Sequence, residues 1–229
     1  MSKLSVIIPA AGSGERMVSA IPKPFIKVGE KSILEHTIAR FLEFSEVKQI
    51  IVATSKSYIN EIENIVGHFV TDVHFDIVEG GKERQFSIYN ALKHVGEEID
   101  LVAVHDAVRP FVRVELIEEC CRAAEKVGGA VLGVPAKDTI KRVDESLTIQ
   151  ETPNRSFLWQ AQTPQVFQRQ LLIDAYESAI SDGYVGTDDA SLVERISGKV
   201  QMVEGDRENL KITYPVDLKI AELIIGKGS

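Results

Sequence analysis

A loop near the start of the chain combines glycines with two cations. It reads PAAGSGERM over residues 9–17, and PKPF follows at residues 22–25. The loop comes directly after an apolar run, so its backbone amides lie where a strand ends and can approach phosphate oxygens. Arg16 and Lys23 add positive charge beside these amides. The stretch therefore predicts a polyphosphate site, although a Gly-Ser-Gly sequence can also be a plain turn.

Two common phosphate-binding loops do not fit this stretch. A dinucleotide-binding fingerprint requires a third glycine, where this chain has Met17, and an acidic residue at the end of the second strand. The second expected strand ends in ATSKS, which carries no carboxylate. A Walker A loop requires a Gly-Lys-Ser or Gly-Lys-Thr ending, which this loop also lacks. The sequence therefore argues against hydride transfer with a nicotinamide cofactor and against a P-loop.

A second charged group lies in VHDAVRPF, residues 104–111. Asp106 stands just past the end of the fourth expected strand, and Arg109 follows one turn later. Mg²⁺ is typically held by one or two carboxylates plus substrate phosphates, so Asp106 is a candidate metal ligand. Asn209 is a candidate second ligand; alternatively, Asp106 only caps the next segment. His105 and the other histidines lie on unrelated elements, which indicates ordinary core or surface residues.

The chain shows no arrangement typical of nucleophilic catalysis. No Ser/His/Asp or Cys/His set is recognisable in the sequence. The two cysteines, Cys120 and Cys121, are adjacent in the apolar-periodic stretch VELIEECCRAAEKVGG. Neighbours on a helix point in different directions, so we expect buried or half-buried thiols and a reducing compartment.

Composition and charge limit the class of protein. The 229 residues are 44% hydrophobic, which favours a single α/β domain over residues 1–229. The net charge of -8 argues against a nucleic acid or an anionic membrane as a partner, because both require a positive face. The opening apolar run is too short for a signal peptide, and no run is long enough to cross a bilayer. We therefore expect a cytoplasmic protein.

The elements that must position these residues alternate between two patterns. Short apolar runs predict strands at residues 4–10, 47–54, 73–80, 100–107 and 129–136. Helix-face spacing predicts helices at residues 32–44, 57–69, 84–95 and 114–127, and Ser32 with Glu35 predicts a capping box at the first. Such β/α alternation predicts an open, mainly parallel, Rossmann-like sheet flanked by helices. Ligands bind these sheets at the carboxyl ends of the strands, where Gly12 and Asp106 are expected.

The alternation breaks after Pro135. Residues 138–153 alternate like two strands around a polar turn at residues 144–146, which predicts a small β-hairpin arm over about residues 136–156. The hairpin has little apolar surface of its own, and an isolated hairpin is marginal in water, so we expect a subunit partner to support it. Beyond the arm, the pattern predicts helices at residues 170–180, 188–196 and 217–225 and a strand at residues 200–205.

Motifs spread from residue 9 to about residue 218 occur together in this chain. They are PAAGSGERM with PKPF, EGGKERQFSIYNAL, VHDAVRPF, DTIKR, LWQAQTPQVF, TDDASLVE and NLKITYPVDL. In this order and spacing the chain resembles the 2-C-methyl-D-erythritol 4-phosphate cytidylyltransferases of non-mevalonate isoprenoid biosynthesis. The resemblance implies a nucleotidyltransferase that uses CTP, a sugar-alcohol phosphate and Mg²⁺. It also implies a homodimer in which the arm reaches into the neighbouring subunit, so that the sites are shared.

The resemblance implies roles for individual residues as well. Those expected to stabilise the triphosphate in the transition state are Arg16 and Lys23. Those expected to position the sugar phosphate are Arg155 and Lys211. Those expected to hold the nucleotide are Ala10, Ala11, Gly12, Gly81 and Ser87. Those expected to contact the sugar alcohol or its phosphate are Asp106, Arg109, Thr139 and Thr187, with Asp106 also near the metal.

The chemistry of these substrates agrees with the residue types. A phosphate monoester has its second pKa near 6, so the attacking oxygen is largely ionised at neutral pH and no general base is needed. The obstacle is repulsion from the triphosphate, about 4 kcal/mol for two unit charges about 4 Å apart at an effective dielectric of about 20. Fixed cations and a metal must offset this repulsion. This requirement explains why an acidic chain concentrates Arg and Lys in these loops.

Two other functions stay open. The first is a cytidylyltransferase for ribitol 5-phosphate, which TDDASLVE and TIKR disfavour. The second is a nucleotide-binding module without turnover, which the presence of Arg16 and Lys23 disfavours. Arg155 can instead pair with a carboxylate such as Glu151. Lys82 after the Gly-Gly pair departs from some relatives, as does Phe86, so we expect recognition of the base through backbone groups.

Overall fold

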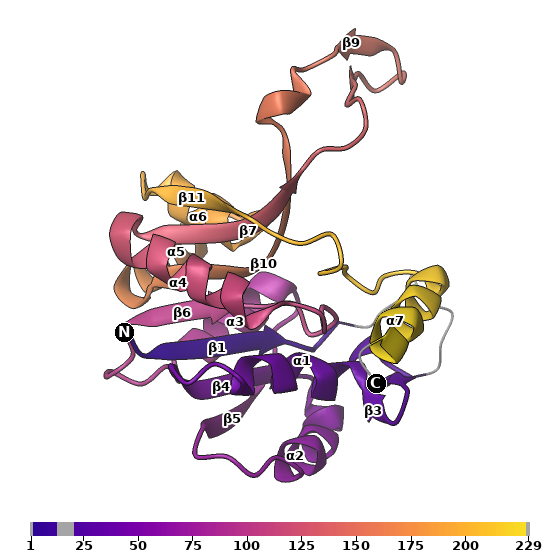
Figure 1. The fold of residues 1–229 in the computed structure, drawn as a ribbon. Coiled ribbons are helices and arrows are strands. Elements are labelled where there is room, and N and C mark those ends of the chain that lie inside the picture. The colour runs from indigo at the N-terminus through magenta and orange to yellow at the C-terminus, as the bar shows by residue number, and fades with distance from the viewer. Residues whose placement is uncertain (1, 13–20, 228–229) are drawn as a thin grey trace.

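The computed structural model describes residues 2–12 and 21–227 and contains one large sheet (Figure 1). Its seven strands lie in the order β11-β7-β10-β6-β1-β4-β5. They are β1 (Leu4–Pro9), β4 (Val47–Thr54), β5 (His74–Glu79), β6 (Leu101–Val104), β7 (Gly129–Pro135), β10 (Trp159–Gln168) and β11 (Val200–Glu204). Neighbours pair in parallel, except that β10 is antiparallel to β6 and β7. The open, mainly parallel sheet is therefore confirmed.

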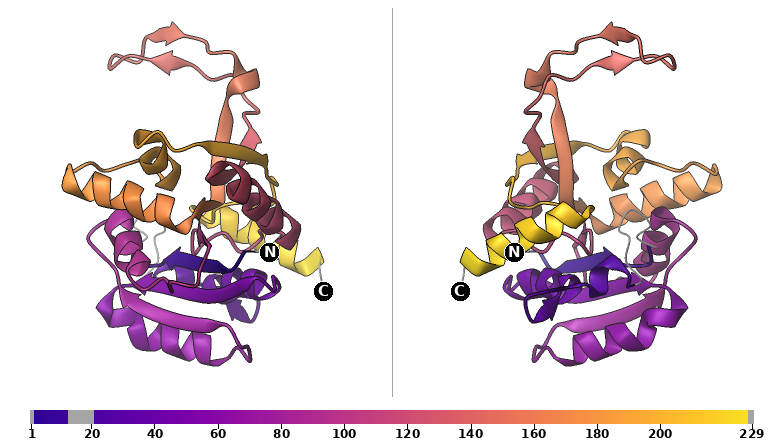
Figure 2. Two further views of the ribbon diagram at one scale, coloured as in Figure 1. Left: turned by 90° about the vertical axis from the view of Figure 1, so that its left-hand side faces the viewer. Right: turned by 90° about the vertical axis from the view of Figure 1, so that its right-hand side faces the viewer.

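Helices cover both faces of this sheet (Figure 2). One face carries α1 (Ile33–Leu42), α2 (Ile59–Gly67) and α4 (Val114–Val127). The other carries α3 (Arg84–Leu92), α5 (Arg169–Ser181) and α6 (Asp189–Arg195). Successive side chains of a strand point to opposite faces, so Val6 and Ile8 pack in one core and Ile7 in the other. Two cores explain why the central strands read as continuous apolar runs.

Local sequence signals set the ends of several helices. The Ser32 hydroxyl accepts a hydrogen bond from the Glu35 backbone at 3.2 Å, and the Glu35 carboxylate accepts one from the Ser32 backbone at 2.6 Å. The expected capping box is thus confirmed. Helix α4 ends at Gly128, whose φ of 114° lies in a region that glycine adopts without a Cβ clash.

Strand β10 was not among the strands predicted from the sequence. It lies between β6 and β7, with Val166 opposite Ala103 on one side and Ala130 on the other. Its pairing with β7 shifts register between Ala161 and Gln165. The intervening residues leave the regular ladder, which is typical of bulges beside functional sites.

The chain between β7 and β10 forms the expected arm. Strands β8 (Arg142–Val143) and β9 (Ile149–Glu151) pair antiparallel, and the 3₁₀ helix η3 (Arg155–Phe157) leads back to the sheet. In the turn, the Asp144 carboxylate accepts hydrogen bonds from the backbone amides of Ser146 and Thr148, both at 3.0 Å. Figures 1 and 2 show that the arm stands away from the sheet.

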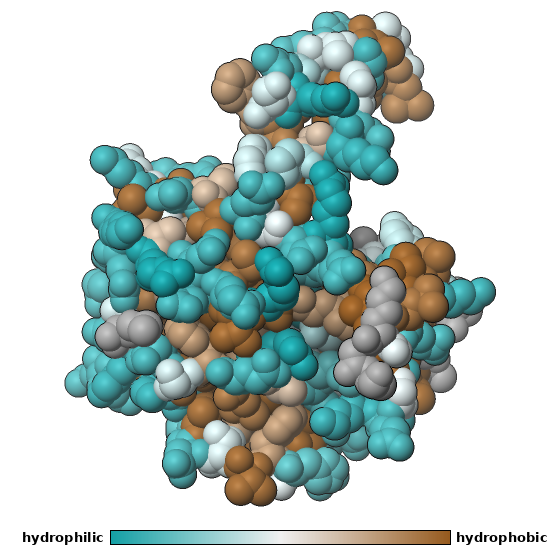
Figure 3. Space-filling model, viewed as in Figure 1, coloured by the Kyte–Doolittle hydropathy of each residue, from teal (hydrophilic) through white to brown (hydrophobic). Residues whose placement is uncertain are grey.

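The arm exposes large hydrophobic side chains. They are Ile140, Val143, Leu147, Ile149 and Phe157, the last being 81% exposed. Figure 3 shows the corresponding hydrophobic patches on the projecting part of the molecule. Apolar surface of this kind marks contact sites in soluble proteins. The subunit partner that the sequence predicts stays a prediction.

A third, smaller group of elements lies beside the carboxyl ends of the strands. It comprises η1 (Lys23–Phe25), β2 (Lys27–Val28), β3 (Lys31–Ser32) and α7 (Pro215–Lys227). The remaining short helix, η2 (Lys56–Tyr58), lies elsewhere in the chain, directly before α2. In the third group, Val28 and Ile33 pack with Val108, Ile212 and Ala221. This cluster joins the C-terminal segment to the first third of the chain. Among the helices described, none is both long and apolar enough to span a membrane.

Candidate active site

A pocket at the carboxyl end of β1 brings together much of the predicted site. Of the predicted residues, it is lined by Ala10, Ala11, Gly12, Lys23, Gly81, Ser87, Asp106 and Lys211. These residues come from five separate segments of the sequence, and the parallel sheet places the segments at one edge. Arg16 lies outside the described residues.

The loop that carries Ala11 and the loop that carries Gly80 and Gly81 pack tightly against each other, where the nucleotide is expected to bind. The Gly81 amide donates a hydrogen bond to the Ser87 hydroxyl at 3.0 Å, and that hydroxyl donates to the Glu83 carbonyl at 3.1 Å. A Cβ on Gly80 would lie 2.7 Å from the Ala11 Cβ and 2.9 Å from the Ser87 hydroxyl oxygen. The Gly80 position therefore has no room for a side chain, and this closeness fixes the two loops against each other.

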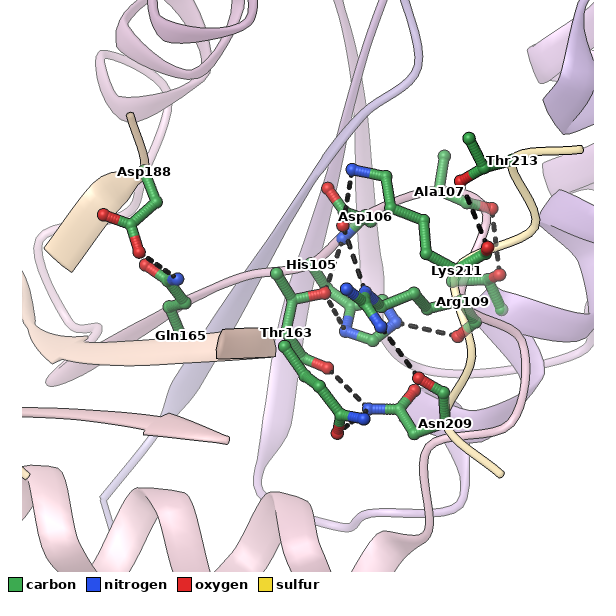
Figure 4. A network of polar contacts seen from close by, with 12 residues as sticks. His105, Asp106, Ala107, Arg109, Thr163, Gln165, Asp188, Asn209, Lys211 and Thr213 are labelled. Atoms are coloured by element: carbon green, nitrogen blue, oxygen red, sulfur yellow. Dashed lines mark hydrogen bonds and ion pairs between the residues drawn. The ribbon is translucent and has the colours of Figure 1, made fainter. Parts of the chain in front are cut away.

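Asp106 is the centre of charge in the pocket (Figure 4). Its carboxylate lies 3.1 Å from the Lys211 ammonium, 3.1 Å from Arg109 Nε and 3.7 Å from Arg84 Nε. Burial alone opposes ionisation, but the charges of these cations outweigh it and hold the pKa of Asp106 well below its usual range. Asp106 is therefore a fixed anion at neutral pH, and the surrounding cations exceed its charge.

Lys211 reaches Asp106 because its segment is tied to the turn after β6. The Ile212 amide donates to the Val108 carbonyl at 2.9 Å, and Arg109 Nη1 donates to the Asn209 carbonyl at 2.8 Å. Arg109 thus does two things, since it pairs with Asp106 and holds the Lys211 segment. The Lys211 side chain is 43% exposed, yet its ammonium lies against the Asp106 carboxylate.

Lys23 is also held in place. It is only 9% exposed, and its ammonium donates a hydrogen bond to the Thr213 carbonyl at 2.8 Å. The Thr213 amide in turn donates to the Asp217 carboxylate at the start of α7, at 2.7 Å. A lysine that lines a pocket and is almost buried is placed to act on an anion there, because a charge away from bulk water acts more strongly on its neighbours.

Arg84 is a site residue that the sequence analysis did not single out. It lines the pocket and forms a two-point contact with Asp189, at 3.1 Å and 2.7 Å. Asp189 is completely buried and also accepts a hydrogen bond from the Tyr176 hydroxyl at 2.5 Å. Burial and the adjacent Asp189 charge together raise the pKa of Tyr176 well above its ordinary value. Asp189 lies 105 positions from Arg84, so no local pattern reveals the pair.

Other predicted residues lie apart from this pocket in the same chain. Thr187 lines a second cavity, which shares Glu83 and Arg84 with the pocket. Thr139 and Arg155 are exposed on the arm. The alternative pairing of Arg155 with Glu151 is wrong, because Arg142 contacts Glu151 at 2.9 Å while Arg155 donates to the backbone carbonyl of Lys137 at 3.0 Å.

The side chains around the pocket suit a metal ion that is bound mainly by the phosphates of a substrate. Within residues 2–12 and 21–227, no cluster of three or more His, Cys, Asp or Glu side chains could hold an ion. Asp106 nevertheless places a carboxylate on the pocket wall, as Mg²⁺ bound mainly by phosphates requires. Asn209 is fully buried, and its amide donates to the Thr163 carbonyl at 2.9 Å. His105 is a core residue, as expected, and burial lowers its pKa to about 4.

Known proteins resemble this chain over nearly its whole length. "2-C-methyl-D-erythritol 4-phosphate cytidylyltransferase" of Clostridioides difficile is 49% identical over 222 residues, covering 96% of this chain and 93% of that protein. The enzyme of that name from Caldanaerobacter subterraneus is 44% identical over 225 residues, covering 98% and 99%.

A solved structure agrees with these sequences. The crystal structure of the 4-diphosphocytidyl-2C-methyl-D-erythritol synthase of Anaerococcus prevotii superposes with a TM-score of 0.88 at 32% identity, covering 98% of this chain and 96% of that one. The profile of the family 2-C-methyl-D-erythritol 4-phosphate cytidylyltransferase matches residues 4–227. The chain therefore belongs to the 2-C-methyl-D-erythritol 4-phosphate cytidylyltransferase family.

Proposed function

We propose that this chain transfers a cytidylyl group from CTP to 2-C-methyl-D-erythritol 4-phosphate, giving 4-diphosphocytidyl-2-C-methyl-D-erythritol and pyrophosphate. The observation that carries the proposal is the convergence of Lys23, Lys211 and Asp106 on one pocket beside the glycine turn. Full-length similarity to proteins named for this reaction supports the choice of substrates. The expected cytoplasmic location stays a prediction.

In the proposed reaction, a phosphate oxygen of the sugar alcohol attacks the α-phosphorus of CTP. A new P–O bond forms as the bond to the pyrophosphate leaving group breaks. Lys23 neutralises charge on the triphosphate, with Arg16 as a second cation, and Lys211 draws the incoming phosphate toward the pocket. Because the nucleophile is already ionised, the chain contributes position and charge rather than a base.

The nucleotide is held in this proposal by the two closed loops. Ala10, Ala11, Gly12 and Gly81 line the pocket, and the Ser87 hydroxyl accepts a hydrogen bond from the Gly81 amide. Lys82 also lines the pocket, which agrees with base recognition through the backbone rather than through an acidic side chain.

We assign Mg²⁺ as the metal and Asp106 as its protein ligand. The metal would supply charge neutralisation on the phosphates. The Lys211 ammonium that now pairs with Asp106 would then be released for the sugar phosphate. Asn209 is not assigned, because it is not among the described residues that line the pocket. Its side-chain nitrogen donates to Gln162 and Thr163, and its side-chain oxygen, the atom that would bind a metal, is buried.

We further propose that two copies of the chain share each site. Thr139 and Arg155 have little to act on within their own chain, because the arm carries them away from the pocket (Figure 1). The exposed apolar side chains of the arm fit a partner subunit. Thr187, in the cavity next to the pocket, is assigned to the sugar alcohol, as are Asp106, Arg109 and Thr139.

One experiment tests the function directly. Pyrophosphate release is measured with CTP and either methylerythritol phosphate or ribitol 5-phosphate, with and without Mg²⁺. We expect metal-dependent release with methylerythritol phosphate and at least a hundredfold lower kcat/KM with ribitol 5-phosphate. The reverse preference would assign the ribitol enzyme, and CTP binding without turnover would assign a binding module.

A further inference from the structure

The loop between α5 and α6 carries Thr187, which is assigned to the sugar alcohol. Residues 182–188 form this loop, and most of them are exposed, so burial contributes little to its position. At its end, the Asp188 carboxylate accepts hydrogen bonds from the Ser191 amide and from the Gln165 side chain, both at 2.9 Å (Figure 4). These contacts fix the residue that follows Thr187.

A buried side chain from α3 holds the middle of the same loop. Gln85 is the second residue of α3 and is 6% exposed. Its Nε2 donates a hydrogen bond to the Tyr184 carbonyl at 2.9 Å, and its Oε1 accepts one from the Gly186 amide at 2.9 Å. A carbonyl only accepts and a backbone amide only donates, so these two partners set the orientation of the Gln85 amide. The second partner is the residue directly before Thr187.

Gly186 is also confined by α6. A Cβ at this position would lie 2.5 Å from the Ser191 hydroxyl oxygen and 2.6 Å from Leu192 Cδ2. The Gly186 backbone therefore packs directly against the first turns of α6 while its amide is hydrogen-bonded to Gln85. Contacts on either side in sequence, at Gly186 and at Asp188, leave Thr187 little freedom to move.

The start of α3 joins this loop to the part of the pocket that is expected to hold the nucleotide. Arg84, directly before Gln85, lines the pocket, and the Ser87 hydroxyl accepts a hydrogen bond from the Gly81 amide. Gln85 is not among the described residues that line this pocket, but it lines the adjoining cavity together with Thr187. It can therefore act on the substrates only through the loop that it holds.

We propose that Gln85 is a positioning residue for the sugar alcohol, because it fixes the backbone that presents Thr187. This proposal rests on the proposed function for its kinetic consequences. Its structural content, a buried amide that holds the Thr187 loop against α3, does not.

Gln85→Met removes both hydrogen bonds and keeps a side chain of similar length. Water can reach the freed backbone groups of this exposed loop, so we expect the protein to fold and the loop to lose its fixed position. Losing one hydrogen bond to the substrate should raise the KM for methylerythritol phosphate by about threefold to tenfold. The KM for CTP should stay within about twofold, because the Gly81 and Ser87 contact remains. A rise of less than threefold for methylerythritol phosphate would overturn the proposal.

Gln49→Met is the matched control. Gln49 is also 6% exposed, and its amide makes the same kind of bridge, donating to the His94 carbonyl at 2.8 Å and accepting from the Gly96 amide at 3.3 Å. It lies near the amino end of β4, whereas the pocket lies at the carboxyl ends of the strands. We expect at least as large a fall in the unfolding temperature as in Gln85→Met, with both KM values within about twofold of the wild type. An equal rise of the KM for methylerythritol phosphate in the two variants would overturn the proposal.

A double-mutant cycle shows whether Gln85 acts through Thr187. Thr187→Val removes the hydroxyl with little change in shape and should itself raise the KM for methylerythritol phosphate. If Gln85 serves only to place that hydroxyl, adding Gln85→Met to Thr187→Val raises this KM by less than about twofold further. Effects of the two substitutions that multiply would show that Gln85 acts by another route and would overturn the proposal.

Hydrogen exchange separates this proposal from the proposed function. NMR measures the exchange rate of the Gly186 amide, which is slow when the amide is hydrogen-bonded and the loop stays closed. We expect exchange at least about tenfold faster in Gln85→Met than in the wild type, and an unchanged rate in Gln49→Met. Equal rates in the wild type and Gln85→Met would overturn the proposal even if the enzyme is active. If the wild type transfers nothing to methylerythritol phosphate, the proposed function fails, while the expected exchange rates still support the hold of Gln85 on the loop.

Discussion

Asp106 shows how an acidic chain builds a cationic site. The net charge of the chain is -8, yet three cations, Lys211, Arg109 and Arg84, lie within 3.7 Å of this single carboxylate. Lys23 adds a further positive charge on the same pocket. The anion keeps the cations from repelling one another before substrate binds, and a local positive excess remains to attract phosphates.

Lys23→Ala should lower kcat about a hundredfold or more, because removing one fixed donor to developing charge has effects of about 10²- to 10³-fold. Pyrophosphate release at saturating substrates measures the change. Lys48→Ala is the matched control, since the exposed Lys48 also donates to a backbone carbonyl, that of Ser45 at 2.7 Å. Turnover of Lys23→Ala close to that of Lys48→Ala would remove Lys23 from the mechanism.

Among the elements, α3 and α6 are joined through a buried ion pair. Arg84 is the first residue of α3 and Asp189 the first of α6, and the two contact each other at 2.7 Å. The Asp188 side chain, which caps α6, also accepts a hydrogen bond from Gln165 of β10 at 2.9 Å. These contacts place α6, and Thr187 just before it, next to the pocket.

Asp189→Asn should lower the free energy of unfolding by about 3 kcal/mol or more, because it leaves the Arg84 charge without its buried partner. Urea unfolding measures this change. Asp182→Asn removes a carboxylate that pairs with Arg195 but is 52% exposed, so its effect should stay below about 1 kcal/mol. Equal losses in the two variants would show that the Arg84 contact is no stronger than a surface pair.

The arm is the element whose role depends most on a partner. Arg155→Ala should raise the KM for methylerythritol phosphate about tenfold or more and leave the KM for CTP within threefold, because Arg155 is assigned to the sugar phosphate alone. Initial-rate kinetics with each substrate varied in turn provide the measurement. Arg142→Ala, which removes an exposed arginine paired with Glu151 on the same arm, should change neither constant by more than threefold. An effect of Arg155→Ala confined to CTP would contradict its assignment.

The whole molecule is expected to work as a pair of chains. Arg155→Ala and Lys23→Ala alter residues that the same chain holds apart, one on the arm and one at the pocket. If the arm of one copy completes the pocket of the other, mixed dimers contain one site with both residues intact. At methylerythritol phosphate concentrations well below KM, where each variant alone is slow, mixing the two should therefore restore about a quarter of wild-type activity when subunits exchange at random. Mass spectrometry of the dimers shows whether subunits have exchanged. Exchange without recovery of activity would place each site within a single chain.

The fold was largely predictable from the sequence, because its strands and helices have distinct periods. Helix α4 has the predicted bounds, and β4 does as well. Strand β10 was missed because it mixes Pro164 with buried glutamines, of which Gln165 bonds to Asp188 and Ala190. Such polar residues suit a strand only when distant partners satisfy them, and those partners are not visible in sequence.

The site was predictable where a motif lies next to a strand end, as for Gly12 and Asp106. The motifs did not reveal Arg84, since its position depends on Asp189, which the fold brings close from far along the chain. In the proposed dimer, the positions of Thr139 and Arg155 relative to a pocket depend on a second chain. Sequence spacing within one chain carries no information about that distance.

The place of β10 in the sheet bears on how the chain folds during its synthesis. β6 and β7 are not neighbours, because β10 lies between them. Before β10 is made, β6 can pair with β1, whereas both described partners of β7, β10 and β11, still have to be synthesised. A nascent chain that has emerged only as far as the arm exposes one edge of β6 and both edges of β7, which can pair wrongly with another chain. The ribosome must therefore release residues 159–168 before the two halves of the sheet can join, and with them Thr163 reaches Asp106.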